Sequence, residues 1–277
     1  MSGKYNYVEK GHHDNVSTYQ HHPSTLDNLA AKIDLRKAGA FPPVFDQKNL
    51  NSCTANAISA ALYFDMVKQK VKDVFIPSRL FIYYNEREIE GKVDNNAPVS
   101  MKDCIATISK NGYCSESMWP YDVGKFADKP PQTGYDFAKS HKAVKTHKLP
   151  FNLDHLKACI HEGIPFVFGF KVYEQFESAE TKSSGKIPMP KPDEKMIGGH
   201  AVLAVGYDDQ EEHFIIRNSF GSSWGDEGYG YMPYNYISSL DKLAFDFWVV
   251  QKVVDKDDPG SGLSNNKGCM SVLLSIF

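Results

Sequence analysis

The feature of this 277-residue sequence that most restricts its fold is a change of hydrophobic period in the middle of the chain. In the first part, apolar residues recur at helical spacing, as Ala57, Ile58, Ala61 and Leu62 do. In the second part, short runs of Val, Ile, Phe and Tyr are separated by Gly, Asp and Asn, which is typical of strands and turns. The pattern predicts an α+β fold in which a helical half precedes a β-rich half.

The predicted elements follow from these periods and from the residues that end them. The expected helices span residues 53–70, 78–90, 100–110 and 153–162, and the last three each stop at a glycine. The expected strands span residues 165–172, 200–207, 214–218, 229–233 and 244–253. Asn51 or Ser52 is a good N-cap, so Cys53 is expected in the first turn of its helix. Residues 182–195 contain three prolines and are predicted to form a surface loop.

Charge, hydropathy and cysteine usage exclude several classes of protein. The net charge is −3 and no long basic run occurs, which argues against nucleic acid as the main partner. No stretch approaches the ~18 apolar residues of a membrane span, and residues 1–10 lack the apolar core of a secretory signal. The five cysteines include no C-x-x-C pair, so we expect reduced thiols and no structural zinc. A monomer in the cytoplasm is therefore predicted (or in the host cytoplasm or virion, if the gene is viral), without membrane contact.

Cys53 is the first candidate for chemistry. A thiol at the N-terminus of a helix lies at the positive end of the helix dipole and beside N–H groups without intrahelical partners, and both favour the thiolate. The alternative is a buried cysteine that packs as a small hydrophobic residue. Residues elsewhere in the chain are needed to decide between the two interpretations.

Three such residues complete a set that nucleophilic catalysis requires. His200 follows two glycines, which permit close backbone approach, at the start of an apolar strand. Asn218 ends the strand predicted at 214–218, and Gln47 lies six residues before Cys53. Together the four supply a nucleophile, a base, an amide that orients the base, and a side-chain donor for a developing oxyanion. We expect the Cys53 sulfur within ~4 Å of one His200 ring nitrogen and Asn218 on the other.

The order and spacing of these motifs resemble those of the papain-like cysteine peptidases. The matching segments are Asp34-Leu35-Arg36, Gln47 to Cys53, Gly199-His200-Ala201-Val202, Asn218-Ser219 and Trp224-Gly225-x-x-Gly228-Tyr229. The resemblance covers about residues 30–253 and suits the bacterial, viral and cytosolic branches of the family. It implies a peptidase domain at residues 29–255 with two lobes, a helical one at about 46–140 and a β-barrel-like one at about 141–255. The active site is then expected in the cleft between the lobes.

The same resemblance implies the activity. The chain would be a cysteine endopeptidase that cleaves protein or peptide substrates through a covalent thioester acyl-enzyme, with no cofactor and no metal. The catalytic residues would be Cys53, His200, Asn218 and Gln47, and the substrate-binding candidates are Gly199, Trp224, Phe245 and Asp246. Phe245 facing the pocket for the second acyl-side residue would suit apolar side chains, whereas Asp246 facing it would admit Arg or Lys.

The chain also departs from the family pattern. Leu50 stands where papain has a disulfide cysteine, Thr54 follows the nucleophile in place of tryptophan, and Phe220 replaces the tryptophan that shields the His–Asn pair. Phenylalanine is still apolar, so we expect the shielding to persist. The paired glycines that offer backbone to an extended substrate on the acyl side of the scissile bond have no match around residues 95–102. The docking of substrate on that side is therefore left unassigned by the sequence.

Three other functions fit parts of the sequence. A catalytically silent relative that binds peptides would usually lose the nucleophile or the base, and both are present here. A transpeptidase or ligase would use the same acyl-enzyme, and nothing in the sequence separates it from a hydrolase. Metal binding by the pairs His12-His13 and His21-His22 lacks a cysteine or carboxylate at ligand spacing.

The two ends of the chain lie outside the motifs. Residues 1–28 are interpreted as an N-terminal extension and candidate short pro-segment, with Tyr5, Tyr7 and Tyr19 as aromatic anchors. We hypothesise that this extension packs on the body, where the cleft is the most concave apolar surface, and limits access to Cys53. The alternative is an extension held only by neighbouring molecules. Residues 256–277 are interpreted as a flexible tail that ends in an apolar run of eight residues.

Overall fold

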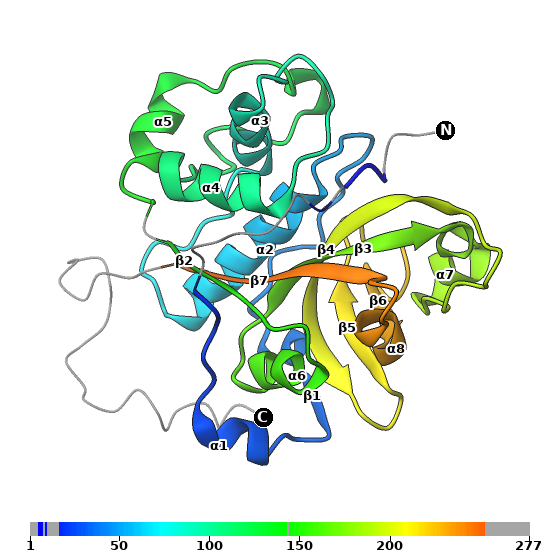
Figure 1. Cartoon of the computed structure of the whole chain (residues 1–277). Helices are drawn as coiled ribbons and strands as arrows, with labels where there is room; N and C mark the ends of the chain where they lie inside the picture. The colour runs from blue at the N-terminus through cyan, green and yellow to red at the C-terminus, as the bar shows by residue number, and fades with distance from the viewer. Residues whose placement is uncertain (1–4, 8, 10–16, 143, 253–277) are drawn as a thin grey trace.

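The computed structural model describes residues 5–7, 9, 17–142 and 144–252 (Figure 1). The helices are α1 (Pro23–Asp27), α2 (Cys53–Lys68), α3 (Arg79–Ile89), α4 (Met101–Asn111), α5 (Gln132–Ala138), α6 (Leu153–His161), α7 (Ala179–Ser184) and α8 (Tyr234–Ser238). The strands are β1 (Lys32–Asp34), β2 (Val144–Lys148), β3 (Phe166–Tyr173), β4 (Met196–Asp208), β5 (His213–Arg217), β6 (Tyr229–Pro233) and β7 (Ala244–Lys252). Short 3-10 helices span Leu35–Ala38, Val123–Lys125 and Glu174–Glu177.

The strands form one antiparallel sheet in the order β2-β7-β3-β4-β5-β6, and β1 pairs with β4 outside this path. In Figure 1 helices α3, α4 and α5 gather on one side of the molecule, the sheet lies on the other, and α2 runs between them. The predicted α+β architecture, with a helical part and a β-rich part, is therefore confirmed.

Helix α2 is the element on which the two parts meet. It packs against β4 and β7 as well as against α3 and α4, and it is buried around most of its circumference. A helix that is apolar or small on all sides suits such a central position. Its small residues Ala55, Ala57, Ala60 and Ala61 let the neighbouring elements approach closely. This packing fixes Cys53, the first residue of α2, at the junction of the helices and the sheet.

The boundaries of the four predicted helices, which are α2, α3, α4 and α6, agree with the sequence signals to within two residues, whereas α1, α5, α7 and α8 were not predicted. Ser78 and Ser100 are the N-caps of α3 and α4, and each side-chain oxygen accepts a hydrogen bond from the backbone N–H three residues later. Gly112 ends α4 with a φ of 75°, a conformation that glycine adopts at low cost. Side-chain capping thus operates at α3 and α4, whereas the cap predicted before Cys53 is not made, since Ser52 forms no side-chain hydrogen bond to the first turn of α2.

The β-rich part needs two corrections. Strand β4 begins at Met196, four residues before the predicted start at 200, because residues 196–199 continue the ladder with β3. Residues 182–195 are not simply a surface loop: α7 extends to Ser184, and Ile187 is buried with its N–H donating to the Tyr231 carbonyl over 3.0 Å. Proline-rich composition marks turns, but it does not reveal that one apolar residue between them is inserted into the core.

The cysteines and the helices can be compared with two further predictions from the sequence, on reduced thiols and on membrane spans. Within the described residues, the free cysteines are Cys53, Cys104, Cys114 and Cys159. Cys269, the apolar run at 270–277 and the His12-His13 pair lie outside the described residues. In the described part of the chain, every helix is too short or too polar to cross a lipid bilayer.

Candidate active site

Cys53 lies at the N-terminal end of α2 and is only 4% exposed. The backbone N–H of Ala201, in β4, hydrogen-bonds its thiol. Ser52 occupies the N-cap position, but its hydroxyl pairs with the Tyr121 hydroxyl at 2.6 Å and does not cap the helix. The first turn of α2 thus keeps N–H groups that an anion formed at Cys53 could use.

Burial raises the pKa of the Cys53 thiol to about 12, from an ordinary value of 9.0. Hydrogen bonds from the N–H groups of Ala201 and Thr54 act in the opposite direction but are outweighed. The helix terminus thus favours the thiolate as expected, since the N–H groups of Thr54 and Cys53 lower the pKa, but burial outweighs this effect. The cause is the loss of water around the sulfur, which penalises the charged form more than the helix end stabilises it.

His200 and Asn218 form the expected contact between base and orienting amide. The distance from His200 Nε2 to Asn218 Oδ1 is 2.8 Å, and the backbone N–H of Ser219 donates to the same oxygen over 2.8 Å. Since a backbone N–H can only donate, the carboxamide must present its oxygen to both partners, and Nε2 must carry a proton. The neutral imidazole is therefore the Nε2–H tautomer, whose basic nitrogen is Nδ1.

Aromatic rings enclose His200, which is fully buried. Phe220 stacks on the imidazole with 4.8 Å between ring centres and 25° between planes. Tyr5 and Phe170 meet the imidazole at steep angles, with ring centres 6.1 and 5.7 Å away. Trp224 contacts Phe220 edge-on at 6.2 Å. The shielding expected of Phe220 is present, and Trp224 belongs to the shell that supports it.

Gln47 is fully buried and tied to the same strand end through Ser219. Its Oε1 accepts the Ser219 hydroxyl at 2.5 Å, and its Nε2 donates to the Leu50 carbonyl over 2.9 Å. Because an amide nitrogen carries two protons, one donor remains after the bond to Leu50. Ser219 therefore orients both Asn218 and Gln47, a role that the sequence did not reveal although Ser219 belongs to the asparagine motif.

Residues 5–7 of the N-terminal extension cross this site. The Tyr7 N–H donates to the Gly199 carbonyl over 3.2 Å, and the Gly199 N–H donates to the Tyr5 carbonyl over 3.1 Å, which makes a parallel β-bridge centred on Asn6. A Cβ at Gly198 would lie 1.6 Å from the Tyr5 carbonyl oxygen, and one at Gly199 would lie 2.1 Å from that of Tyr7. The two glycines before His200 thus permit the close backbone approach that their sequence predicted.

The side chain of Tyr7 is buried against residues of β3 and β7. Its ring stacks on Phe245, with 5.7 Å between centres and 4° between planes, and its hydroxyl donates to Asp246 Oδ2 over 2.6 Å. A Cβ at Gly169 would lie 2.1 Å from the Tyr7 ring, so this position of the wall must be glycine. Consecutive strand residues normally point to opposite faces. Phe245 and Asp246 both reach Tyr7 because β7 carries one extra residue opposite Val167–Gly169 and Asp246 has a φ of 61°.

A second attachment holds the extension to the β-rich part. Glu162, just after α6, accepts the Tyr19 hydroxyl at 3.0 Å and the His22 backbone N–H at 3.0 Å, and pairs with His21 Nδ1 at 3.3 Å. The Tyr19 N–H also donates to the Lys148 carbonyl over 2.8 Å. The His21-His22 pair is thus used in holding the chain, and across the described ranges no group of three potential metal-ligating side chains occurs.

Glu86 is a buried acid close to the nucleophile that no motif indicated. It lies in α3 and is fully buried, and it accepts the hydroxyl of Thr54, the residue after Cys53, at 3.1 Å. The Cys104 thiol hydrogen-bonds it as well. Burial raises the pKa of Glu86 to about 8, so the neutral acid predominates at pH 7. A negative charge here would further raise the pKa of Cys53.

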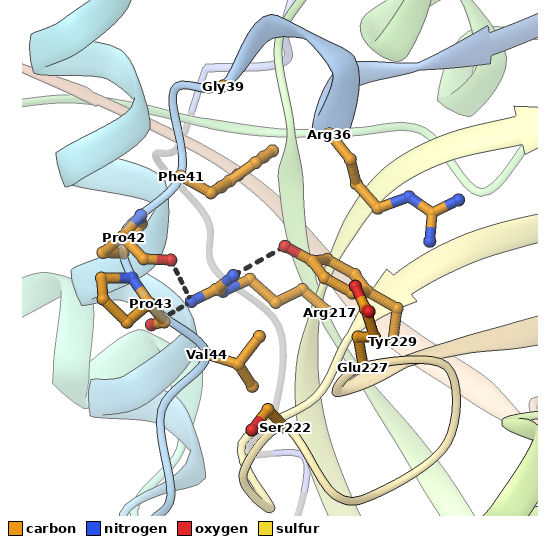
Figure 2. Close-up of a pocket in the computed structure, with 10 residues that line it drawn as sticks. All are labelled: Arg36, Gly39, Phe41, Pro42, Pro43, Val44, Arg217, Ser222, Glu227 and Tyr229. Atoms are coloured by element: carbon orange, nitrogen blue, oxygen red, sulfur yellow. Dashed lines mark hydrogen bonds between the residues drawn. The ribbon is translucent and has the colours of Figure 1, made fainter.

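A pocket of about 510 Å³ lies apart from these residues, between the segment that precedes Gln47 and strands β5 and β6 (Figure 2). Figure 2 shows Arg217 donating to the carbonyls of Pro42 and Pro43 and to the Tyr229 hydroxyl. Arg36, on the opposite wall, is paired with acidic side chains at 2.9 and 3.0 Å. These contacts fasten the segment before Gln47 to β5, the strand that ends one residue before Asn218, and none of the predicted site residues lines the pocket.

The chain is similar to known proteins both in sequence and in fold. The family model of the papain family cysteine proteases matches residues 29–242. The chain is 43% identical over 244 residues to an uncharacterized peptidase C1-like protein of Acanthamoeba polyphaga mimivirus, with 84% of this chain and 77% of that protein covered. Xylellain, a cysteine protease from Xylella fastidiosa, is similar with a TM-score of 0.83 and 40% identity, over 91% of this chain and 97% of its own. Cysteine proteinase 1 of Entamoeba histolytica is 29% identical, over 71% of this chain and 61% of its own length.

Proposed function

The chain belongs to the papain family of cysteine proteases and is a peptide-bond hydrolase; we propose that Cys53, His200, Asn218 and Gln47 are its catalytic residues. The main support is the hydrogen bond between His200 in β4 and Asn218, together with the contact that the N–H of Ala201, the residue after His200, makes with the Cys53 thiol. A nucleophile beside a base, and a base held by an amide, are what acyl transfer to sulfur requires.

In the proposed reaction, His200 Nδ1 takes the proton of Cys53, and the sulfur attacks the carbonyl carbon of the scissile peptide. The resulting oxyanion accepts hydrogen bonds from the Gln47 amide and the Cys53 backbone N–H. The C–N bond then breaks, the protonated His200 gives its proton to the leaving amine, and a thioester acyl-enzyme remains. Water, deprotonated by His200, attacks the thioester, which releases the carboxylic acid and restores the thiol.

We also propose a substrate preference from the residues around Tyr7. Gly199 would bind the substrate backbone, as it binds that of Tyr5 and Tyr7. Phe245 and Asp246 would form the pocket for the second acyl-side residue, with an aromatic wall and a carboxylate at its end. Such a pocket suits Tyr, Arg or Lys, because each combines an apolar stem with a terminal donor.

We also propose that residues 29–255 form the peptidase domain, with a helical lobe at about 46–140 and a β-rich lobe at about 141–255, and that residues 1–28 act as its inhibitory segment. Two effects of the extension support inhibition. It occupies the surface that a substrate backbone would use, at Gly199. It also takes part in the burial that raises the pKa of Cys53, since the Tyr7 side chain belongs to the same buried cluster.

Hydrolysis of a fluorogenic peptide tests the assignment. The full chain carrying Tyr5→Ala and Tyr7→Ala, which weakens the extension, should cleave the peptide, and adding Cys53→Ala should lower kcat at least about a thousandfold. Cys159→Ala is the matched control, since Cys159 is also a buried free thiol but lies in α6, and it should leave kcat within about twofold. Activity that survives Cys53→Ala would rule out the assignment.

A further inference from the structure

The acyl-side rim of the cleft, which lacks the paired glycines of the family, is built from two asparagines. Asn51 Nδ2 donates to the backbone carbonyl of Asn96 over 2.6 Å, and the Asn51 N–H donates to Asn96 Oδ1 over 2.8 Å. The Asn96 carbonyl therefore already accepts a hydrogen bond from within the protein.

These bonds fix the orientation of the Asn51 carboxamide. Because Nδ2 must face the Asn96 carbonyl, Oδ1 must face the other way. Asn96 is itself held, since its Oδ1 accepts the Tyr83 hydroxyl at 2.7 Å and its Nδ2 donates to the Asn49 carbonyl over 2.9 Å. Asn51 is 5% exposed, so its side chain has little freedom to turn. The rim thus presents one preorganised acceptor, two residues before the nucleophile in the chain.

The N-terminal extension shows what this acceptor takes. Asn6 Nδ2 donates to Asn51 Oδ1 over 3.3 Å, while the residues on either side of Asn6 bond to Gly199 on the opposite wall. An extended segment therefore reaches from Gly199 to Asn51 and donates one N–H to each: the Tyr7 backbone N–H to the Gly199 carbonyl, and the Asn6 carboxamide N–H to Asn51 Oδ1.

We infer that Asn51 Oδ1 is the acyl-side docking acceptor of this peptidase and takes an N–H of the substrate where its relatives use rim backbone. The donor is a peptide amide, from the substrate backbone or from a carboxamide side chain. This inference rests on the proposed function and deepens it. Asn51 is then a substrate-binding residue, and Asn96 positions it.

The test compares Asn51 with Asn51→Leu in the full chain that carries Tyr5→Ala and Tyr7→Ala. The substrates are blocked fluorogenic peptides with Asn at the second and third acyl-side positions, versions with each Asn replaced by Leu, and versions with each backbone amide N-methylated. For the parent peptide, Asn51→Leu should lower kcat/KM about 3- to 10-fold through KM, the usual effect of one hydrogen bond. The rate at which iodoacetamide alkylates Cys53 should stay within about twofold, which shows that the nucleophile is intact.

The ratio of kcat/KM between the two proteins identifies the donor. If the ratio falls to about 1 for one N-methylated peptide, the substrate backbone supplies the N–H. If the ratio falls to about 1 for one Leu peptide, the Asn carboxamide of the substrate supplies the N–H. Either result supports the inference. A ratio near 1 for the parent peptide, or the same ratio for every peptide, overturns it. Should Asn51→Leu fail to fold, Asn51→Ala serves equally, because each ratio compares peptides on the same pair of proteins. If the chain with Tyr5→Ala and Tyr7→Ala that keeps Asn51 cleaves none of the peptides, the proposed function fails instead of the inference.

Discussion

Removing the Tyr7 side chain from the cleft should activate the full chain in steps. Tyr7→Phe removes the bond that the hydroxyl donates to Asp246 and the bond that it accepts from the Met101 N–H, and Tyr7→Ala also removes the ring that stacks on Phe245. In both variants Asp246 keeps the 2.6 Å bond that its Oδ1 accepts from Trp248 Nε1, so the carboxylate is not stranded. The two substitutions therefore report on the extension with little damage to the body.

The magnitudes follow from these contacts. A hydrogen bond to a carboxylate contributes roughly 1.5–3 kcal/mol, so Tyr7→Phe should raise the open fraction about tenfold or more. Tyr7 is 3% exposed, and burial of its ring stabilises the closed form by roughly a further 1.5–3 kcal/mol. Tyr7→Ala removes this burial and should raise the open fraction by another factor of about ten to a hundred. The rise stops once the cleft is open all the time.

Alkylation of Cys53 by iodoacetamide measures the open fraction without any substrate. Its rate should increase from wild type to Tyr7→Phe to Tyr7→Ala, and peptide hydrolysis should increase in the same order. The pH at which the rate reaches half its maximum should also fall from the region of 12, because opening the cleft returns water to the sulfur. Tyr135→Phe is the matched control, since it removes a phenol bond to Asn85 within the helical part and should change neither rate.

Two results would refute this reasoning. If Tyr7→Ala leaves both alkylation and hydrolysis at wild-type rates, residues 5–7 do not limit access to Cys53. If both rates rise but the pH profile of alkylation stays where it was, the extension blocks the site only sterically, and the burial that raises the pKa of Cys53 has another origin.

Two further predictions concern buried groups of the site. Glu86→Gln should flatten the pH dependence of stability: the folded chain keeps the Glu86 carboxyl neutral up to about pH 8 while the unfolded chain ionises it near 4.5, so stability falls as pH rises between these values, by at most about 4 kcal/mol. Urea unfolding at pH 5 and pH 8 measures this, and equal losses in wild type and variant would contradict it. Asn218→Ala should lower kcat about 10- to 100-fold in the Tyr5→Ala, Tyr7→Ala chain, because His200 loses the buried acceptor that fixes its tautomer. Unchanged single-turnover acylation would show that Asn218 is not the orienting group.

The sequence predicted the parts of the site that depend on local rules. The start of α2 at Cys53, the glycine that ends α4 and the strand predicted at 214–218, which the structure places at His213–Arg217, each follow from residues within one turn or one strand. The same holds for Gly199, where only glycine lets a second backbone approach. Periodicity, capping and close approach are short-range, so one sequence is enough to read them.

The parts that the sequence could not predict depend on distant partners. Strand β1 is three residues long and exists because it pairs with the end of β4, for example Lys32 with Asp208. The sequence offered Phe245 and Asp246 as alternatives because a regular strand would turn only one of them to the pocket. The bulge between β3 and β7 turns both toward Tyr7, and a bulge is set by pairing, which a single strand does not encode.

The protonation state of Cys53 depends both on a local rule and on tertiary contacts. The local rule, a thiol at a helix N-terminus, favours the thiolate. Tertiary burial, to which Tyr7 contributes, reverses the outcome and leaves a thiol with a pKa of about 12. The helix terminus lowers the pKa of Cys53 and burial raises it. Moving the extension away would remove part of the burial but would leave the helix terminus unchanged, so the pKa would fall. For that reason we expect the extension to control the chemistry of Cys53 as well as access to it, and the shift of the alkylation profile to be the most direct sign of this control.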